Sequence, residues 1–213
     1  MWLFIIILNG VILFTQQIYS KNFEDLPMYK RPPEKIKEIY YPSLSLEEIK
    51  NISQQFSILS PEEVVKTYCD LDAKGARGSG RSKEEDLMAY KITLLVNWVE
   101  EPGWDQTWII DGYEIYNKNI KRDRATISVV YRVIGIYCGN KFHPFCFYQL
   151  INFKLVKTEK GWKITDPLIP PHELKTTFIK YLTKEISLTT DKKWKKELQV
   201  LIDRIKDERF WEH

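Results

Sequence analysis

The stretch from Ala125 to Pro167 constrains the fold of this chain more than any other. Two long runs of alternating β-branched and aromatic residues, ATISVVYRVIGIYC and FCFYQLINFKLVKT, are followed by the shorter run GWKITDP. Such alternation places one set of side chains on each face of a sheet, so the three runs are predicted to be consecutive strands. The stretch predicts a fold, but it assembles almost no recognisable chemistry.

Two cysteines flank the connection between the two long runs, Cys138 at the end of the first and Cys146 near the start of the second. A Cys138–Cys146 disulfide is expected in an exported chain, with Cys69 left unpaired. This link would set the hairpin register and keep the pairs on one face apolar, namely Val133–Ile151, Tyr131–Phe153 and Val129–Leu155. Registers shifted by two residues keep the same faces, and two free thiols are the alternative.

Basic and acidic residues nearly balance, with 32 Lys and Arg against 29 Asp and Glu. A nucleic-acid-binding surface needs a one-signed basic face, so no nucleic-acid partner is expected. The apolar content of 44% and the aromatic content of 14% are typical of a globular domain. His143 is the single imidazole near the cysteine pair and no carboxylate completes a ligand set there, so no metal or other cofactor is expected.

Residues 1–20 contain an apolar run, Trp2 to Phe14, that is interrupted only by Asn9 and Gly10. A spanning helix needs about 20 residues, so the run is more typical of a signal peptide, and a secreted or periplasmic protein is predicted. No Lys or Arg precedes the run, whereas several follow it, and this distribution does not favour export. An uncleaved membrane anchor and a buried N-terminal helix therefore remain as alternatives.

Residues 21–43 are rich in Pro, Lys and Glu and are predicted to form an extended arm. Three Ser-x-x-Glu capping boxes then predict helix starts at Ser45, Ser60 and Ser82. Residues 44–170 are predicted to form one domain, and residues 171–213 a helical extension with apolar stripes. The segment KGARGSGR, residues 74–81, lacks the spacing of a phosphate-binding loop and is predicted to be a flexible connection.

Three short motifs carry a resemblance to a known superfamily. They are Ser60–Val65 at a helix start, Asp123–Thr126 at the entry to the long strand, and Gly161–Pro167. On these motifs, residues 60–170 resemble the nuclear-transport-factor-2-like (NTF2-like) superfamily of cone-shaped domains. The resemblance implies an α+β fold, with helices packed on a curved antiparallel sheet and a pocket at the open end of the cone. Its members include dehydratases, isomerases, epoxide hydrolases and inert binding domains, so the fold does not select a function.

A catalytic site in such a pocket needs an acid or base with a shifted pKa. Asp111 and Glu114 are candidate bases with Arg132 nearby. They are three residues apart on one predicted strand, so their side chains point to opposite faces and at most one faces the pocket. Other ionisable residues are expected elsewhere: Asp70 and Asp72 in solvent, His143 on a surface loop, and His172 outside the sheet. The aromatic residues expected to line an apolar pocket, or else to be core, are Tyr68, Trp98, Trp104, Trp108, Tyr113 and Tyr131.

The sequence therefore favours an exported, non-enzymatic binding or assembly domain for a small apolar ligand or a partner protein. A small-molecule lyase or isomerase that uses a pocket carboxylate is one alternative. A membrane-anchored assembly subunit, whose C-terminal helices contact partners, is another. The enzymatic and the non-enzymatic hypotheses differ in one requirement. Catalysis needs a carboxylate inside a deep pocket, whereas binding needs only apolar walls or an exposed groove.

Overall fold

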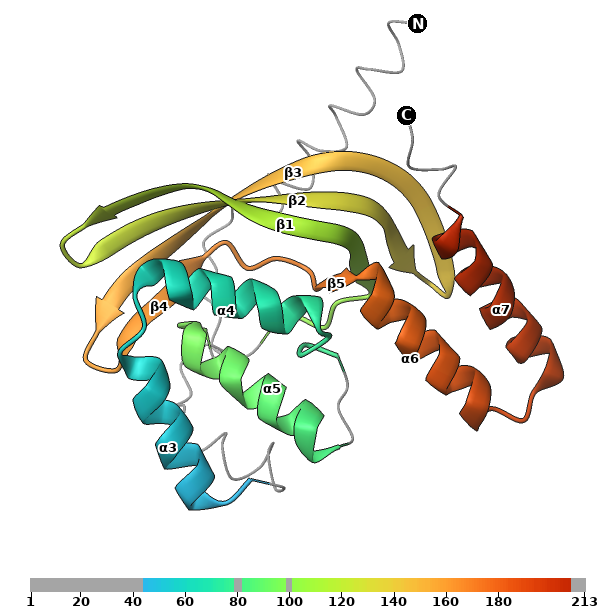
Figure 1. The fold of residues 1–213 in the computed structure, drawn as a ribbon, viewed down its shortest axis with the longest axis horizontal. Helices are drawn as coiled ribbons and strands as arrows, with labels where there is room; N and C mark the ends of the chain where they lie inside the picture. Colours follow the sequence, from blue (N-terminus) through green and yellow to red (C-terminus); the bar gives the residue numbers. More distant parts are fainter. Residues whose placement is uncertain (1–43, 79–81, 99–100, 208–213) are drawn as a thin grey trace, which may run out of the picture.

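The computed structural model describes residues 44–78, 82–98 and 101–207 as an α+β fold. Three helices lie under an arched five-stranded sheet, and two further helices lie beside the curled end of the sheet (Figure 1). The predicted signal peptide or anchor and the predicted arm lie outside the described residues. Within the described ranges, none of the helices has the length and apolar character needed to cross a membrane.

The three covering helices begin where the capping boxes predict. They are α3 (Leu46–Ser57), α4 (Pro61–Ala73) and α5 (Lys83–Leu95). At α4, the Ser60 hydroxyl accepts from the Glu63 amide at 3.3 Å, and the Glu63 carboxylate accepts from the Ser60 amide at 2.8 Å. This reciprocal bonding satisfies amides that the helix leaves open at its start. Helix α4 contributes eight buried residues, whereas α3 contributes none, so α4 is the helix on which the sheet packs.

The three runs of the opening stretch are consecutive strands, as predicted. The sheet consists of β1 (Gln106–Lys121), β2 (Arg124–Cys138), β3 (Lys141–Thr158), β4 (Gly161–Asp166) and β5 (His172–Leu174). Its order is β4-β3-β2-β1-β5, in which the first four strands form an antiparallel meander and β5 runs parallel to β1. Irregularities in the β1–β2 and β2–β3 ladders bend the long strands over the helices, as β-bulges do.

The predicted hairpin register is wrong, although the predicted faces are correct. Val129 lies opposite Ile151, and Cys138 lies opposite Lys141 rather than Cys146. The reason is a two-residue turn at Gly139 and Asn140, both with positive φ, which closes the hairpin directly after Cys138. Up to Val133 the shift relative to the predicted pairs is four residues, an even number, so the apolar face is unchanged; the irregularity after Val133 makes the shift five residues at Cys138.

The predicted Cys138–Cys146 disulfide is not formed, and all three cysteines are free thiols. Val133 pairs with Phe147, so Cys146 lies beside the middle of β2 while Cys138 lies at its end. Four residues of strand separate the two positions by about 13 Å, whereas disulfide-linked Cα atoms lie within about 7 Å. Cys69 is buried in α4 as predicted.

Two hydrophobic clusters hold the elements together. The larger one lies between the sheet and the covering helices and contains Tyr68, Tyr131 and Phe153. The smaller one joins Ile109, Ile134 and Phe142 of the sheet to α6 (Lys175–Leu188) and α7 (Lys192–Lys206). The predicted apolar stripe of α7 is confirmed, because Leu198, Leu201 and Ile205 are all buried in this cluster.

Candidate functional site

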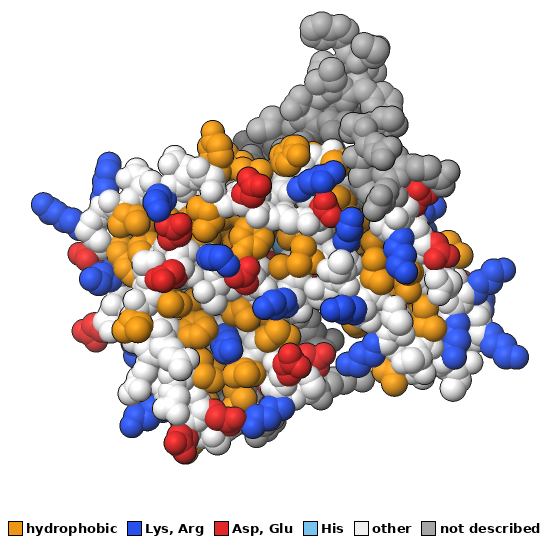
Figure 2. All heavy atoms as spheres, in the orientation of Figure 1, with side chains coloured by type: hydrophobic (Ala, Val, Ile, Leu, Met, Phe, Trp, Pro, Cys, Tyr) orange, Lys and Arg blue, Asp and Glu red, His pale blue; other side chains and the backbone are white. Residues whose placement is uncertain are grey.

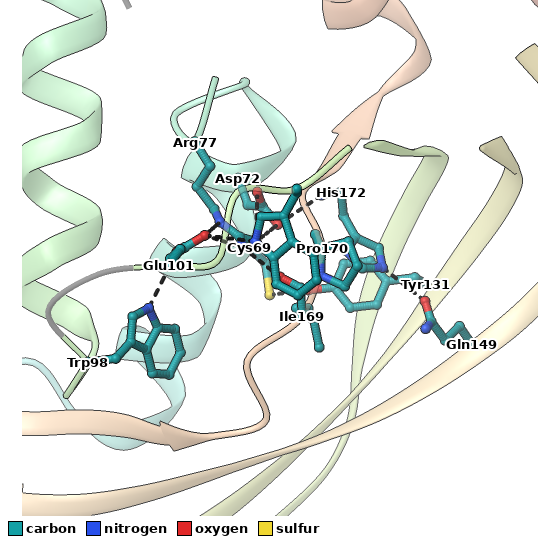
Figure 3. A network of polar contacts seen from close by, with 11 residues as sticks. Cys69, Asp72, Arg77, Trp98, Glu101, Tyr131, Gln149, Ile169, Pro170 and His172 are labelled. Carbon is teal, nitrogen blue, oxygen red and sulfur yellow. Dashed lines mark hydrogen bonds and ion pairs between the residues drawn. The ribbon is translucent and has the colours of Figure 1, made fainter. Parts of the chain in front are cut away.

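Arg77 lies at the centre of a buried polar network between α4 and the sheet (Figure 3). Its side chain is 3% exposed and donates to Glu101 through Nε at 2.8 Å and to the Ile169 carbonyl at 2.5 Å. It also lies 3.4 Å from Asp72. Gly75, with φ +80, turns the chain immediately after α4, so that Arg77 returns under the helix. The prediction of a flexible connection is therefore wrong for Arg77.

Asp72 is also buried, contrary to the prediction that it faces solvent. The carboxylate is 1% exposed and accepts from the backbone amide of His172 at 3.0 Å. Burial raises the pKa of Asp72 to about 6, against the opposing attraction of Arg77. Asp70, two residues earlier, is half-exposed as the helix geometry requires, and it accepts from the Tyr113 hydroxyl at 2.5 Å.

His172 is fully buried and belongs to β5, the edge strand beside β1, although it was predicted to lie outside the sheet. Its Nδ1 lies 2.8 Å from the Pro170 carbonyl, and its Nε2 lies 2.9 Å from the side-chain amide of Gln149. Burial lowers the pKa of His172 to about 3, with Arg77 acting in the same direction, so the ring is neutral near pH 7. The Gln149 atom in this contact is Oε1, so each ring nitrogen faces an acceptor oxygen, and a neutral ring, which has one N–H, donates to one of the two.

A second buried pair, Cys69 and Tyr131, lies beside His172. The Cys69 thiol and the Tyr131 hydroxyl are 3.0 Å apart, and the rings of Tyr131 and His172 have centroids 4.5 Å apart. Burial raises the pKa of the Cys69 thiol well above its usual range. Because the thiolate is the reactive form, Cys69 is not placed as a nucleophile.

Five of the six aromatic residues expected at the pocket meet in one region. Tyr68 and Tyr131 are fully buried, whereas Trp98, Trp108 and Tyr113 are partly exposed and pack against the same cluster. Trp98 Nε1 donates to Glu101 at 3.4 Å, which ties it to the polar network. The structure thus gathers these aromatic residues, but Tyr68 and Tyr131 are core residues rather than an open lining.

Trp108 forms an aromatic face with two residues that the sequence interpretation missed, Phe145 and Phe147. All three are partly exposed, and their ring centroids are 6.4 Å, 5.8 Å and 5.5 Å apart. Trp108 also stacks on His172, with centroids 5.7 Å apart and planes 20° apart. We call Trp108, Phe145 and Phe147 the aromatic face. A sequence signal for Phe145 and Phe147 exists. Both are an even number of residues from Phe153, which was predicted to lie on the apolar face of β3, so alternation places them on the same face.

The predicted catalytic residues do not lie in this region. Arg132 alternates with the buried Tyr131 and Val133, so it points to the other face of β2. There it donates to Asp111 at 2.8 Å, and Lys175 lies 3.0 Å from the same carboxylate. Glu114 is exposed, and so is His143, whose surface position was predicted. Arg132 and Asp111 do meet, but as a part-exposed ion pair.

A separate hollow of about 380 Å³ lies between α5 and α6. We call it the α5–α6 cavity. Its walls come from the segment after α4, from α5, α6, β1, β2 and β5, and its lining residues include Lys74, Glu85, Glu173, Phe178, Lys180 and Lys184. Across the described ranges, no three His, Cys, Asp or Glu side chains are grouped so as to hold a metal ion.

No protein-family model matches this sequence, and no curated protein matches it. A solved structure to which the chain is similar is described as an NTF2-like transpeptidase from Campylobacter jejuni. The identity is 18%, the match covers 51% of this chain and 100% of that chain, and the TM-score is 0.26. Within this chain itself, three capped helices pack under a curled antiparallel meander. This architecture is the cone-shaped α+β fold that the sequence predicts.

Proposed function

We propose that the chain is a binding domain that takes a small apolar ligand, or an apolar segment of a partner protein, on the aromatic face. The observation that carries the proposal is that Trp108, Phe145 and Phe147 are partly exposed while each ring is held against the others. Aromatic rings supply a large apolar contact area, and rings already held in place lose little freedom on binding.

The support behind the aromatic face is rigid. His172 lies under Trp108 with an acceptor oxygen beside each ring nitrogen, and Tyr131 lies under His172. Because these two residues are completely buried, the face cannot collapse inward without breaking the polar network. This arrangement favours a preformed binding surface.

The lyase or isomerase alternative has weaker support. A general base must be free to accept a proton from a substrate held in a dry pocket. Asp111 instead faces two cations, Arg132 and Lys175, on a part-exposed surface, and Glu114 is exposed. Within the buried polar network, the acid and base candidates are Asp72 and His172, and both already have partners.

The binding proposal is tested with Nile red, a neutral apolar dye, in a fluorescence titration of the wild-type chain and two variants. Phe147→Ala removes one ring of the aromatic face, and we expect it to weaken dye binding by about fivefold or more. Tyr148→Ala is the matched control, since Tyr148 is the next residue of β3, is 72% exposed and points to the other side of the sheet. Equal loss in both variants, or an absence of dye binding to the wild type, contradicts the proposal.

We further propose that the protein is exported, as the apolar run before Phe14 indicates. The alternative is an assembly subunit that keeps residues 1–20 as a membrane anchor. Intact-mass analysis of the protein made in cells separates the two. A species that begins near Lys21 supports export, and a full-length, membrane-bound species supports the anchor.

A further inference from the structure

The α5–α6 cavity is distinct from the aromatic face and has a different chemical character. Its volume of about 380 Å³ is within the range of small-molecule sites. Apolar walls come from Phe178 and Tyr181 of α6 and from Tyr137 of β2. The ring of Phe178 lies 4.9 Å from that of Tyr137 and 6.1 Å from that of Tyr181, so one wall is a continuous aromatic surface.

Three lysines line the cavity, and two of them have no counter-ion among the described residues. Lys184 lies 3.7 Å from Glu85, and this pair bridges α6 and α5. In the described part of the chain, neither Lys74 nor Lys180 forms an ion pair. Figure 2 shows blue basic side chains along α6 on the side that faces α5. The rim therefore has an excess of positive charge directed at the hollow, which attracts anions.

The start of α6 adds to this field. Thr177, in the first turn of α6, lines the cavity, no side chain caps the helix start, and no acidic residue occurs in the first turn. The amides at a helix start carry partial positive charge and accept anionic groups. The cavity thus combines a helix start with unpaired lysines.

Two glutamates line the cavity: Glu85, which pairs with Lys184, and Glu173. Glu173 forms no hydrogen bond or ion pair with another described residue. Burial raises the pKa of Glu173 to about 7, and Asp72 adds to the effect. The groups that face it from the surrounding elements are Asp72, Lys74, Glu85, Tyr137, Lys180, Tyr181 and Lys184. Near neutral pH, Glu173 is therefore able to take a proton and donate a hydrogen bond to a ligand oxygen.

We propose that the α5–α6 cavity binds a small organic anion, whose carboxylate or phosphate pairs with Lys74 and Lys180 and whose apolar body packs on Phe178 and Tyr181. The two unpaired lysines and the aromatic wall supply complementary parts of one site. Binding in the α5–α6 cavity does not depend on the aromatic face. The anion site and the proposed function are therefore tested independently.

Three probes of similar size and the same phenol group test the sign of the charge: 4-hydroxyphenylacetate, tyramine and 2-(4-hydroxyphenyl)ethanol. The first is an anion, the second a cation and the third neutral. Binding is followed by changes in the backbone amide NMR signals of Gly75, Gly78 and Thr177, which line the cavity. We expect the anion to bind at least about tenfold more tightly than the cation, with a Kd near about 1 mM. Phenyl phosphate then shows whether the site prefers a phosphate.

Two lysine variants test the proposed contacts. Lys74→Gln and Lys180→Gln are each expected to weaken binding of 4-hydroxyphenylacetate about two- to fivefold, as exposed ion pairs do. Lys196→Gln is the matched control, because Lys196 is an exposed lysine of α7 that does not line the cavity. Added salt is expected to weaken binding to the wild type and to the control variant alike.

Glu173→Gln tests the carboxyl. Ionised Glu173 repels an anion, so wild-type affinity is expected to fall several-fold between about pH 6 and pH 8, and Glu173→Gln is expected to remove this dependence. Tighter binding of tyramine than of the anion would overturn the proposal. So would amide changes confined to residues outside the cavity, or no binding at about 10 mM probe.

Discussion

Arg77 pairs with two carboxylates, those of Asp72 and Glu101, while its own side chain is buried. Removing one member of such a buried set leaves the remaining charges without compensation. Arg77→Met is therefore expected to lower the free energy of unfolding by about 3–5 kcal/mol, measured by urea denaturation. Lys66→Met is the control, because Lys66 pairs with Asp70 on the surface. We expect that change to cost less than about 1 kcal/mol, and similar losses in both variants would contradict the role of Arg77.

His172 is expected to stay neutral far below the usual range for histidine. Its pKa falls from 6.5 to about 3, so the stability it contributes is complete above about pH 6.5 and is lost as the pH falls toward 3. Asp72 acts in the opposite direction: its contribution is complete below 3.8 and is lost as the pH rises through about 6.

The titration of His172 is measured directly from its imidazole proton NMR signals. Substitution of His143 and His213 by Asn leaves His172 as the one histidine in the chain. We expect its signals to remain those of a neutral ring down to about pH 4. A titration midpoint near pH 6.5 would contradict this expectation, since it would show that the ring becomes charged in the folded protein within the ordinary range for histidine.

The sequence anticipates the apolar side of the site better than its polar side. Tyr68, Trp108 and Tyr131 follow from alternation and helical spacing, because apolar periodicity reports which face is buried. Arg77 and Asp72 have no such signal, since a charged residue near a helix end is ordinarily solvated. Their burial depends on contacts with Glu101 and Ile169, far along the chain. Only tertiary structure supplies those partners.

Among the elements, the helix starts and the antiparallel meander were predictable because capping boxes and alternation are local signals. The hairpin register was predicted wrongly, although Gly139 and Asn140 form a recognised two-residue turn. The predicted Cys138–Cys146 disulfide implied a longer loop, which is incompatible with a two-residue turn directly after Cys138. Strand β5 has three residues, which is too few for any period to appear.

The register of the β2–β3 hairpin has a chemical consequence. Because Cys138 and Cys146 lie apart, three thiols per chain are expected to react with Ellman's reagent in denaturant without reductant. The Cys69→Ala variant is the control and is expected to give two. A single reactive thiol in the wild-type chain would show that a disulfide forms and that the hairpin register differs.

On the scale of the whole molecule, α6 and α7 are packed on the sheet through a cluster of their own. Leu198→Ala, at a buried position of α7, is expected to cost about 2–4 kcal/mol of global stability. Val200→Ala is the control on the same helix, since Val200 is 56% exposed. Far-UV circular dichroism and tryptophan fluorescence are expected to report one coincident transition. Two separate transitions would show that the helices unfold independently of the sheet.

The cone-shaped architecture as a whole was predictable from the order of its elements, helices first and then a meander that ends in GWKITDP. The position of the α5–α6 cavity was not, because its walls come from segments as distant as Lys74 and Lys184. No local pattern reports where such segments meet. The packing of α6 against the sheet decides it.

Strand β5 separates two environments with very few residues. His172 and Leu174 turn toward the larger cluster, whereas Glu173 between them turns toward the α5–α6 cavity. Inserting one residue before His172 would exchange these orientations, since side chains alternate along a strand. The imidazole would then face the α5–α6 cavity, and the Glu173 carboxyl would turn toward the larger cluster beside Ile110. This short strand therefore tolerates substitution more readily than any change in its length.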